Sequence, residues 1–291
     1  MKTTDTFKEK DTKKLKACIA LDLDGTTLNN EGQLSDKNKE AIAYAISRGV
    51  HIIIASGRAY NTLPKQILEL PGIEYAVTSN GAAVCHVPEG EVLQGLKIKE
   101  EVVHRILEMT REYEIVYEAF VDGHAYADRR YVQDPLRYGA SEEAVEYVKR
   151  TRQFVEDMPA FIKEHGASLD SMDIVVKNSE MRQEIYEVLE EVKEEIYVTS
   201  SVPQLVEISD KYSGKAAGLR YLKEHLGISK DYMAAIGNAD NDRDMIAYAK
   251  YGYAVANASS GCKEAADVIL KSNDQDGVAE GIYDFLAKLK E

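Results

Sequence analysis

The sequence predicts an α/β protein: a Rossmann-like, doubly wound parallel-sheet core with a second, α+β domain inserted into it. Two observations carry this prediction. Short apolar runs alternate with amphipathic helical segments near both ends of the chain, which is typical of a parallel sheet with helices on both faces. In the middle, the apolar runs alternate with polar residues, which favours an antiparallel sheet with one covered face.

The first part of the core starts with an apolar run at 15–23 that ends in a carboxylate, as a buried parallel strand at a ligand site does. Residues 1–15 are polar and are expected to form a loose lead-in. Ser35 offers an N-cap to a helix that ends at Gly49. The rest of this β-α-β-α-β unit follows in order: strand 51–58, helix 61–70 and strand 74–82.

The pattern changes in the middle of the chain and later returns. The strands predicted for the middle part are 90–98, 115–132 and 173–178, and charged helices are predicted over 99–114 and 179–195. After 202–210 the first pattern resumes with helix 214–227, strand 232–239, helix 241–252, strand 253–259 and helix 261–270. The prediction is therefore a core made of 1–82 and 206–291, with an inserted cap domain over 83–205.

The composition excludes several classes of function. The 291 residues carry a net charge of -14, so neither nucleic acid nor an anionic membrane surface is an expected partner. A phosphate ester would also be repelled, so a phosphate site here requires a local cation. The three cysteines lie far apart, which argues against a disulfide framework or a zinc site. Without an apolar secretion signal or an apolar run of ~18 residues, a cytoplasmic protein is expected, as a monomer or a homodimer.

Polar segments stand at the carboxyl ends of predicted core strands or at the start of a predicted helix. Ligands of open α/β sheets bind at that edge, so these segments are expected to meet there. They are 22–26 (DLDGT), 56–58 (SGR), Lys215 and 237–242 (GNADND).

In this order, and together with TSNGA at 78–82, these segments resemble those of the haloacid dehalogenase superfamily. The large insertion before Lys215 resembles that of the Cof-type branch, subfamily IIB, whose members carry an α/β cap at this place. The resemblance covers nearly the whole chain. It implies a magnesium-dependent phosphatase that acts on a small phosphorylated metabolite.

Each catalytic residue type suits phosphoryl transfer, which requires an in-line nucleophile and neutralisation of the phosphoryl oxygens. Asp22 is the predicted nucleophile and would form an aspartyl phosphate. Asp24 is the predicted acid and base, which protonates the leaving oxygen and then deprotonates water. Ser56 resembles the hydroxyl that the family uses to bind a phosphoryl oxygen. Lys215 would pair with the same oxygens and hold Asp22 ionised.

Other residues are predicted to line the substrate side of the site. Gly25 and Thr26 would supply a tight loop and backbone N–H groups near the phosphate. The further candidates for substrate binding are Arg58, Asn80 and Asn241. Within the cap, the substrate is expected to be selected near Glu118, Tyr126 or Arg130.

The resemblance also implies a Mg²⁺ site made of Asp22, the backbone carbonyl of Asp24, and the fourth segment, where the family reads GDxxND. This chain has Asn238 in place of the expected carboxylate, with Asp242 as the other candidate ligand. An amide offers a carbonyl oxygen but no charge, so the sequence predicts an active enzyme that requires more magnesium than its relatives.

The lysine segment also departs from the family, which usually has glycine after the lysine. Here Ala216 follows Lys215, and Gly214 precedes it. Lys211 is therefore kept as the alternative lysine.

Two other functions are compatible with the sequence. A phosphomutase shares the core and returns the phosphoryl group to its substrate. A catalytically weak binding or sensor protein is favoured only by Asn238 and is opposed by the presence of Asp22, Asp24, Ser56 and Lys215 together. The prediction is therefore a phosphomonoesterase with a sugar phosphate or a nucleotide-type monophosphate as substrate.

Overall fold

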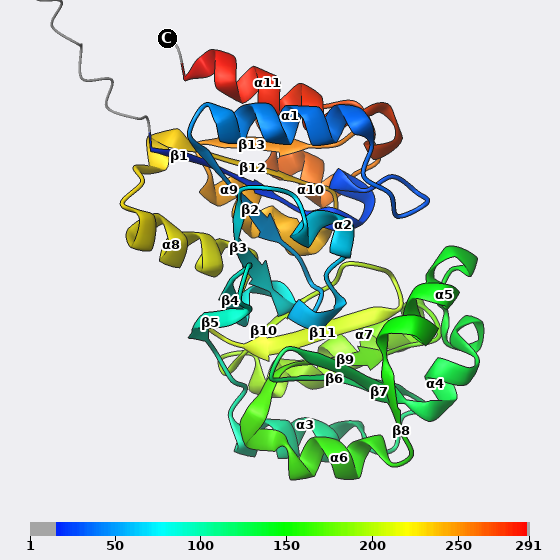
Figure 1. Ribbon diagram of the computed structural model, residues 1–291. Coiled ribbons are helices and arrows are strands. Elements are labelled where there is room, and N and C mark those ends of the chain that lie inside the picture. Colours follow the sequence, from blue (N-terminus) through cyan, green and yellow to red (C-terminus); the bar gives the residue numbers. More distant parts are fainter. Residues whose placement is uncertain (1–15, 290–291) are drawn as a thin grey trace, which may run out of the picture.

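The computed structural model of the protein describes residues 16–289 and contains two sheets (Figure 1). The first has the strand order β14-β13-β12-β1-β2-β3-β4-β5, and the second β10-β11-β9-β6-β7-β8. The segment from β14 to β3 is parallel, whereas β4 and β5 are added antiparallel to β3. The α/β fold class and the doubly wound parallel core that the sequence predicts are confirmed. The expected lead-in at 1–15 lies outside the described residues.

The parallel strands are short and apolar, as buried strands of an α/β sheet are. Their bounds are β1 (Ala17–Leu21), β2 (Val50–Ala55), β3 (Ile73–Thr78), β12 (Met233–Gly237), β13 (Tyr251–Ala254) and β14 (Val268–Ile269). The antiparallel edge is β4 (Ala83–His86) and β5 (Glu91–Gly95). The chain order reverses between β1 and β12, which places the topological switch point at the end of β1.

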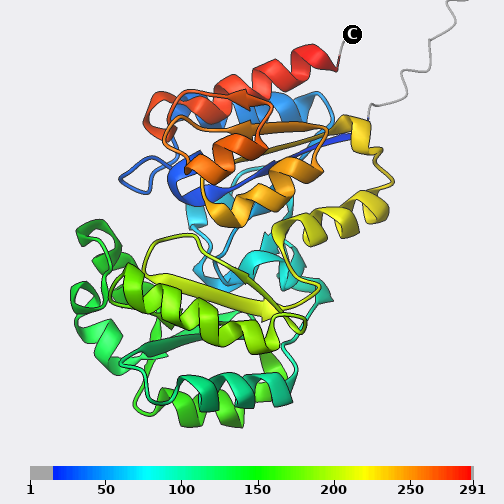
Figure 2. The same cartoon turned by 180° about the vertical axis from the view of Figure 1, so that it is seen from behind.

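Helices cover both faces of this sheet (Figures 1 and 2). One face carries α1 (Asp36–Ser47) and α11 (Gly277–Lys288), and the other carries α8 (Lys215–Leu226), α9 (Arg243–Tyr248) and α10 (Ser260–Ala265). The predicted cap of α1 is present, because the Ser35 side chain accepts a hydrogen bond from the Asn38 backbone. The short α2 (Lys65–Leu68) lies after β2.

The second sheet is antiparallel except for its β7–β8 pair. Its strands are β6 (Val116–Val121), β7 (His124–Asp128), β8 (Gln153–Val155), β9 (Leu169–Val175), β10 (Ile196–Thr199) and β11 (Leu205–Asp210). The face turned away from the first sheet packs on α3 (Glu100–Thr110), α6 (Met158–Glu164) and α7 (Ser179–Leu189) (Figure 1). The opposite face packs at one end on α4 (Arg129–Gln133) and α5 (Glu142–Thr151).

Sheet membership differs from the predicted domain boundaries at 83 and 205. Strands β4 and β5 extend the first sheet, so that sheet continues to Gly95. Strand β11 completes the second sheet, although its residues were assigned to the core. We call the part of the chain from 96 to 210 the cap. Boundaries of this kind depend on strand pairing, which the local pattern does not determine.

Some predicted elements are shorter than expected. The helix expected over 61–70 is a 3₁₀ turn (Tyr60–Thr62) followed by α2, because Pro64 sits between them and disfavours a continuous helix. The helix expected over 261–270 ends at Ala265, and β14 follows it as an edge strand. No helix among residues 16–289 has the length and apolar character needed to cross a membrane.

Candidate active site

The site begins where β1 ends. Asp22 follows Leu21 directly and donates its backbone N–H to Ile236 of the neighbouring β12 at 3.0 Å. The chain then turns through 23–27, where the Thr27 hydroxyl donates to the Asp22 carbonyl oxygen at 2.5 Å. These contacts fix the Asp22 backbone, so its buried side chain projects from the carboxyl edge of the sheet.

A buried lysine joins this carboxylate to the fourth segment. Lys215, fully buried at the start of α8, donates to Asp22 Oδ1 at 2.8 Å and to Asp242 Oδ1 at 2.6 Å. The other Asp242 oxygen accepts the backbone N–H groups of Asn238 at 2.8 Å and Ala239 at 3.0 Å. The two carboxylates raise the pKa of Lys215 despite its burial. Lys211, the alternative, is exposed and lies over the Tyr212 ring.

The second oxygen of Asp22 has no partner. Asp22 Oδ2 is buried and makes no hydrogen bond, whereas Oδ1 is held by the lysine. Burial, followed by the charge of Asp242, raises the pKa of Asp22 to about 7, although Lys215 opposes this. Lys215 is therefore the group that favours the ionised form of Asp22, against burial and the charge of Asp242.

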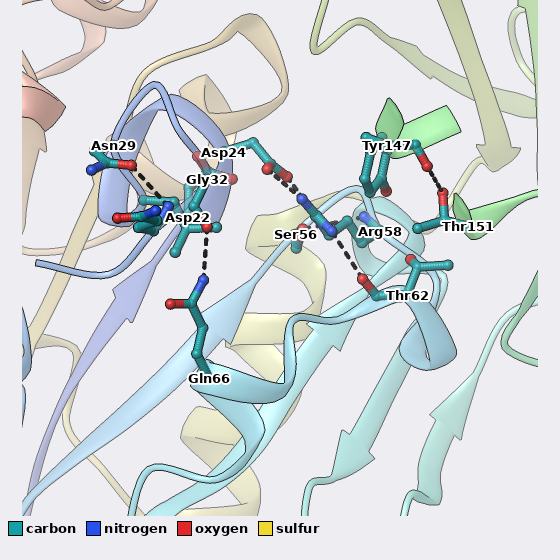
Figure 3. A network of polar contacts seen from close by, with 12 residues as sticks. Asp22, Asp24, Asn29, Gly32, Ser56, Arg58, Thr62, Gln66, Tyr147 and Thr151 are labelled. Atoms are coloured by element: carbon teal, nitrogen blue, oxygen red, sulfur yellow. Dashed lines mark hydrogen bonds and ion pairs between the residues drawn. The ribbon is translucent and has the colours of Figure 1, made fainter. Parts of the chain in front are cut away.

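Asp24 lies in a different environment from Asp22. Its carboxylate is about half exposed and is held by Arg58, with Nε 2.7 Å from Oδ2 and Nη2 2.6 Å from Oδ1. The same guanidinium donates to the Thr62 carbonyl oxygen at 2.9 Å and lies 4.2 Å from the centre of the Tyr147 ring on α5 (Figure 3). Arg58, predicted on the substrate side, thus links the acid–base candidate to the cap.

The turn after β2 is held by the turn after β3. The Ser56 hydroxyl accepts the Arg58 backbone N–H at 3.2 Å, and the Ser56 carbonyl oxygen accepts the Asn80 N–H at 3.2 Å. Asn80 has a left-handed backbone (φ 52°), and its Oδ1 accepts a hydrogen bond from Asn241 Nδ2 at 3.0 Å. The Asn80 carbonyl oxygen accepts the N–H of Gly214, next to the lysine. The sequence-predicted residues Ser56, Asn80 and Asn241 are therefore brought together.

The loop that carries Asp24 lies against the fourth segment. Gly25 has φ 72°, and a Cβ there would lie 2.5 Å from Asn238 Nδ2, so only glycine fits. Thr26 is buried, and its hydroxyl has no hydrogen-bond partner. Asn257 donates to the Gly25 carbonyl oxygen at 2.8 Å. Asn238 therefore lies against the loop that carries Asp24.

The donor set at this loop is of the kind that fits a magnesium ion. Magnesium prefers oxygen ligands, and the Asp22 carboxylate and the amide of Asn238 lie at this loop. Within the described part of the chain, no three His, Cys, Asp or Glu side chains form a metal-binding group. Both oxygens of Asp242 already accept hydrogen bonds, so its contacts hold Lys215 and the Asn238 backbone.

Several site residues were missed by the sequence analysis. Asp244 accepts the Ala216 N–H at 3.1 Å and supports the start of α8. Glu207, Asp173 and Arg152 are buried on the cap face that meets the core. For Glu207 the signal available was polar residues at alternate positions of an apolar strand, Glu207 and Ser209 in VEISD.

Of the three cap residues that were expected to select the substrate, only Glu118 lies on the cap face that meets the core. Glu118 is buried on the core-facing side and pairs with Arg152 at 2.7 Å. Tyr126 packs on Phe161 in the cap core, and Arg130 is exposed and pairs with Asp128.

The sequence was compared with those of known proteins. The sequence profile of the haloacid dehalogenase-like hydrolases matches residues 19–282. The chain is 28% identical over 276 residues to the phosphatase YwpJ of Bacillus subtilis, covering 90% of this chain and 96% of the relative. It is 29% identical over 264 residues to the 5-amino-6-(5-phospho-D-ribitylamino)uracil phosphatase YcsE of the same organism, covering 91% and 93%.

A solved sugar phosphatase of superfamily subclass IIB has the same fold. It superposes with a TM-score of 0.77 at 20% identity, covering 92% of this chain and 98% of the other. The predicted resemblance and the predicted enzyme class, a phosphatase, are thereby confirmed. The chain belongs to the haloacid dehalogenase-like hydrolases.

Proposed function

We propose that the protein is a magnesium-dependent phosphomonoesterase that hydrolyses a small phosphorylated metabolite through an aspartyl phosphate on Asp22. The observation that carries the proposal is the partnerless Asp22 Oδ2, held beside Lys215 at the switch point of the sheet. A nucleophile needs one free oxygen and a fixed orientation, and the lysine bond to Oδ1 supplies the orientation.

Asp22 Oδ2 attacks the phosphorus while Lys215 pairs with a phosphoryl oxygen. Ser56 and the backbone of the 23–27 turn supply further donors to the phosphoryl group. Asp24 protonates the leaving oxygen and then takes a proton from the water that attacks the aspartyl phosphate. Arg58 pairs with both oxygens of ionised Asp24, which is the form that takes the proton from water.

Asp22, Asn238 and the backbone carbonyl of Asp24 would hold magnesium. Bound there, the ion would neutralise phosphoryl oxygens and favour the ionised form of Asp22. We assign Asp242, predicted as a ligand, the role of holding Lys215 and the Asn238 backbone, because both of its oxygens are engaged.

The substrate class we propose is a sugar phosphate or a nucleotide-type monophosphate, in line with the uracil-containing substrate that the name of YcsE gives. The test is phosphate release from a panel of monophosphates with magnesium. Asp22→Asn should abolish release, whereas Asp36→Asn, an exposed substitution on α1, should leave it unchanged. Phosphate release from a single substrate also excludes a phosphomutase. Equal activity of Asp22→Asn and the unsubstituted enzyme would refute the proposal.

A further inference from the structure

Three carboxyl side chains lie side by side across the cap sheet, on the face turned to the catalytic loops. Glu207 on β11 is directly paired with Asp173 on β9, which is directly paired with Glu118 on β6. All three are more than nine-tenths buried. Their neighbours in each strand, such as Ile208 and Ile174, point the other way into the apolar core of the cap. We call these three side chains the carboxyl row.

The Glu207 end of the row touches the turns that hold the phosphate-site residues. Glu207 Oε1 lies 3.4 Å from where a Cβ of Gly57 would be, one residue after Ser56. The same oxygen accepts a hydrogen bond from Ser201 Oγ at 3.0 Å. The Asn80 side chain of the β3 turn lies at the same place, with its Oδ1 3.2 Å from that Cβ position. This end of the row is therefore adjacent to the catalytic residues.

The Glu118 end reaches the catalytic site through two arginines. Arg152 binds both Glu118 oxygens, with Nε 2.7 Å from Oε1 and Nη2 3.2 Å from Oε2. Arg152 also donates to the Tyr147 hydroxyl at 3.1 Å, and the Tyr147 ring carries Arg58 at 4.2 Å. Since Arg58 holds Asp24, these side chains link the Glu118 end of the row to the residue proposed to protonate the leaving group.

The row has more carboxyl groups than cations to pair with them, and one of its acceptor atoms has no hydrogen-bond donor. Each arginine or lysine near it already has a carboxylate partner: Arg152 has Glu118, and Arg58 has Asp24. Within residues 16–289, Asp173 and Glu207 form no ion pair. Burial, followed for Asp173 by the charge of Glu207, raises the pKa of both groups. Glu207 Oε2 is buried and accepts no hydrogen bond, a costly state that a ligand donor would relieve.

We propose that the carboxyl row binds the part of the substrate that departs with the ester oxygen, and that it selects a leaving group that offers hydroxyl or amine donors and carries no negative charge. Carboxyl oxygens accept hydrogen bonds from such donors. A second phosphate or a carboxylate would instead be placed beside Glu207 and Asp173, where no cation is available to it. This inference rests on the proposed phosphatase function.

The test compares phosphate esters that differ in the leaving group. The esters are a pentitol monophosphate, a hexosamine monophosphate, a hexose bisphosphate, phosphoglycerate and p-nitrophenyl phosphate. The first two should exceed the bisphosphate and phosphoglycerate in kcat/KM by at least about tenfold, or ~1.4 kcal/mol. The ratio between the pentitol and hexosamine esters distinguishes hydroxyl from amine donors. An equal or higher kcat/KM for the two anionic leaving groups would overturn the inference.

Substitution of Glu207 tests the row directly. Glu207→Gln presents an amide N–H₂ where an acceptor was, so the KM for the preferred ester should rise by roughly tenfold. The rise in KM for p-nitrophenyl phosphate should be several times smaller. The kcat/KM for phosphoglycerate should increase relative to that for the preferred ester. Ser201→Ala, which removes one hydrogen bond to Glu207, should give a smaller shift in the same direction. Glu180→Gln, on the exposed start of α7, is the matched control.

Two outcomes separate the inference from the proposed function. An equal loss on every ester, with kcat rather than KM affected, would mean that Glu207 only supports the turn at Gly57, and the inference would fail alone. Absence of phosphate release from any of these esters, p-nitrophenyl phosphate included, would overturn the proposed function and the inference with it.

Discussion

Asn238→Asp should restore the carboxylate that the family places in the metal site, and it should lower the magnesium requirement. The amide of Asn238 is neutral, whereas a carboxylate there adds one formal negative charge beside the proposed Mg²⁺ site. The attraction between that charge and the cation should strengthen metal binding. We expect the magnesium concentration for half-maximal activity to fall by about 10- to 100-fold, equivalent to ~1.4–2.7 kcal/mol.

The same substitution should lower the thermal stability of the metal-free protein. Lys215 is already shared by two carboxylates, so a third has no cation of its own until magnesium binds. The melting temperature without magnesium should fall, and the rise on adding magnesium should be larger than for the unsubstituted protein. Differential scanning fluorimetry over a magnesium titration measures both effects without relying on activity.

The matched control is Asn257→Asp. This substitution places the same charge near Gly25, whose carbonyl oxygen accepts a hydrogen bond from Asn257, but Asn257 is not a proposed magnesium ligand. It should not lower the half-saturating magnesium concentration. An unchanged magnesium requirement in Asn238→Asp, or an equal fall in Asn257→Asp, would refute the reasoning that the amide weakens the site.

Three further substitutions test other parts of the account. Lys215→Met leaves two buried carboxylates unpaired and should lower the free energy of unfolding by about 3–5 kcal/mol in urea titrations; a loss near zero would contradict the ion-pair assignment. The pKa of Asp173 is raised, so the Asp173 carboxyl group binds its proton more tightly in the folded state than in the unfolded state. The folded state therefore loses stability as pH rises from the ordinary carboxyl pKa to the raised pKa of Asp173. Asp173→Asn removes that loss, so it should stabilise the protein more at about pH 8 than at about pH 5 in thermal melts, and a stabilisation independent of pH would contradict this. Gly81 has φ 89°, and a Cβ at this position would clash with the Gly214 carbonyl group, whereas a Cβ at Gly32 would meet open space. Gly81→Ala should therefore unfold at a lower urea concentration than Gly32→Ala, which loses only ~1–2 kcal/mol through backbone strain. Equal losses of unfolding free energy in the two variants would contradict the close approach at Gly81.

The core part of the site followed from the sequence because parallel strands bring their carboxyl ends to one edge. That rule was enough to place Asp22 near the segment 237–242 that follows β12. Lys215 begins α8 after a strand of the cap sheet, so its place beside Asp22 was expected from the family resemblance and not from this rule. The rule did not determine which side chains point at one another. Arg58 pairs with Asp24, and Asp242 pairs with Lys215, because a buried or half-buried charged group is stabilised by the nearest group of opposite charge.

The cap could not be assembled from local pattern. Whether Glu207 faces the cap core or the catalytic loops depends on how β11 is docked, and the sequence analysis assigned residues 206–210 to the core domain. Tyr126 shows the same limit, because alternation along β7 places it in the cap core while Ala125 packs with Ala59 of the core. Strand pairing over long sequence separations decides both cases.

The most direct test of the central claim is to trap the covalent intermediate on Asp22. The enzyme is quenched with acid during turnover of a preferred ester, reduced with borohydride, and digested for peptide mass spectrometry. An aspartyl phosphate at Asp22 would be reduced to homoserine at that position, and the product should be absent from Asp22→Asn. Phosphate release without any modified Asp22, or modification at another carboxylate, would contradict the account.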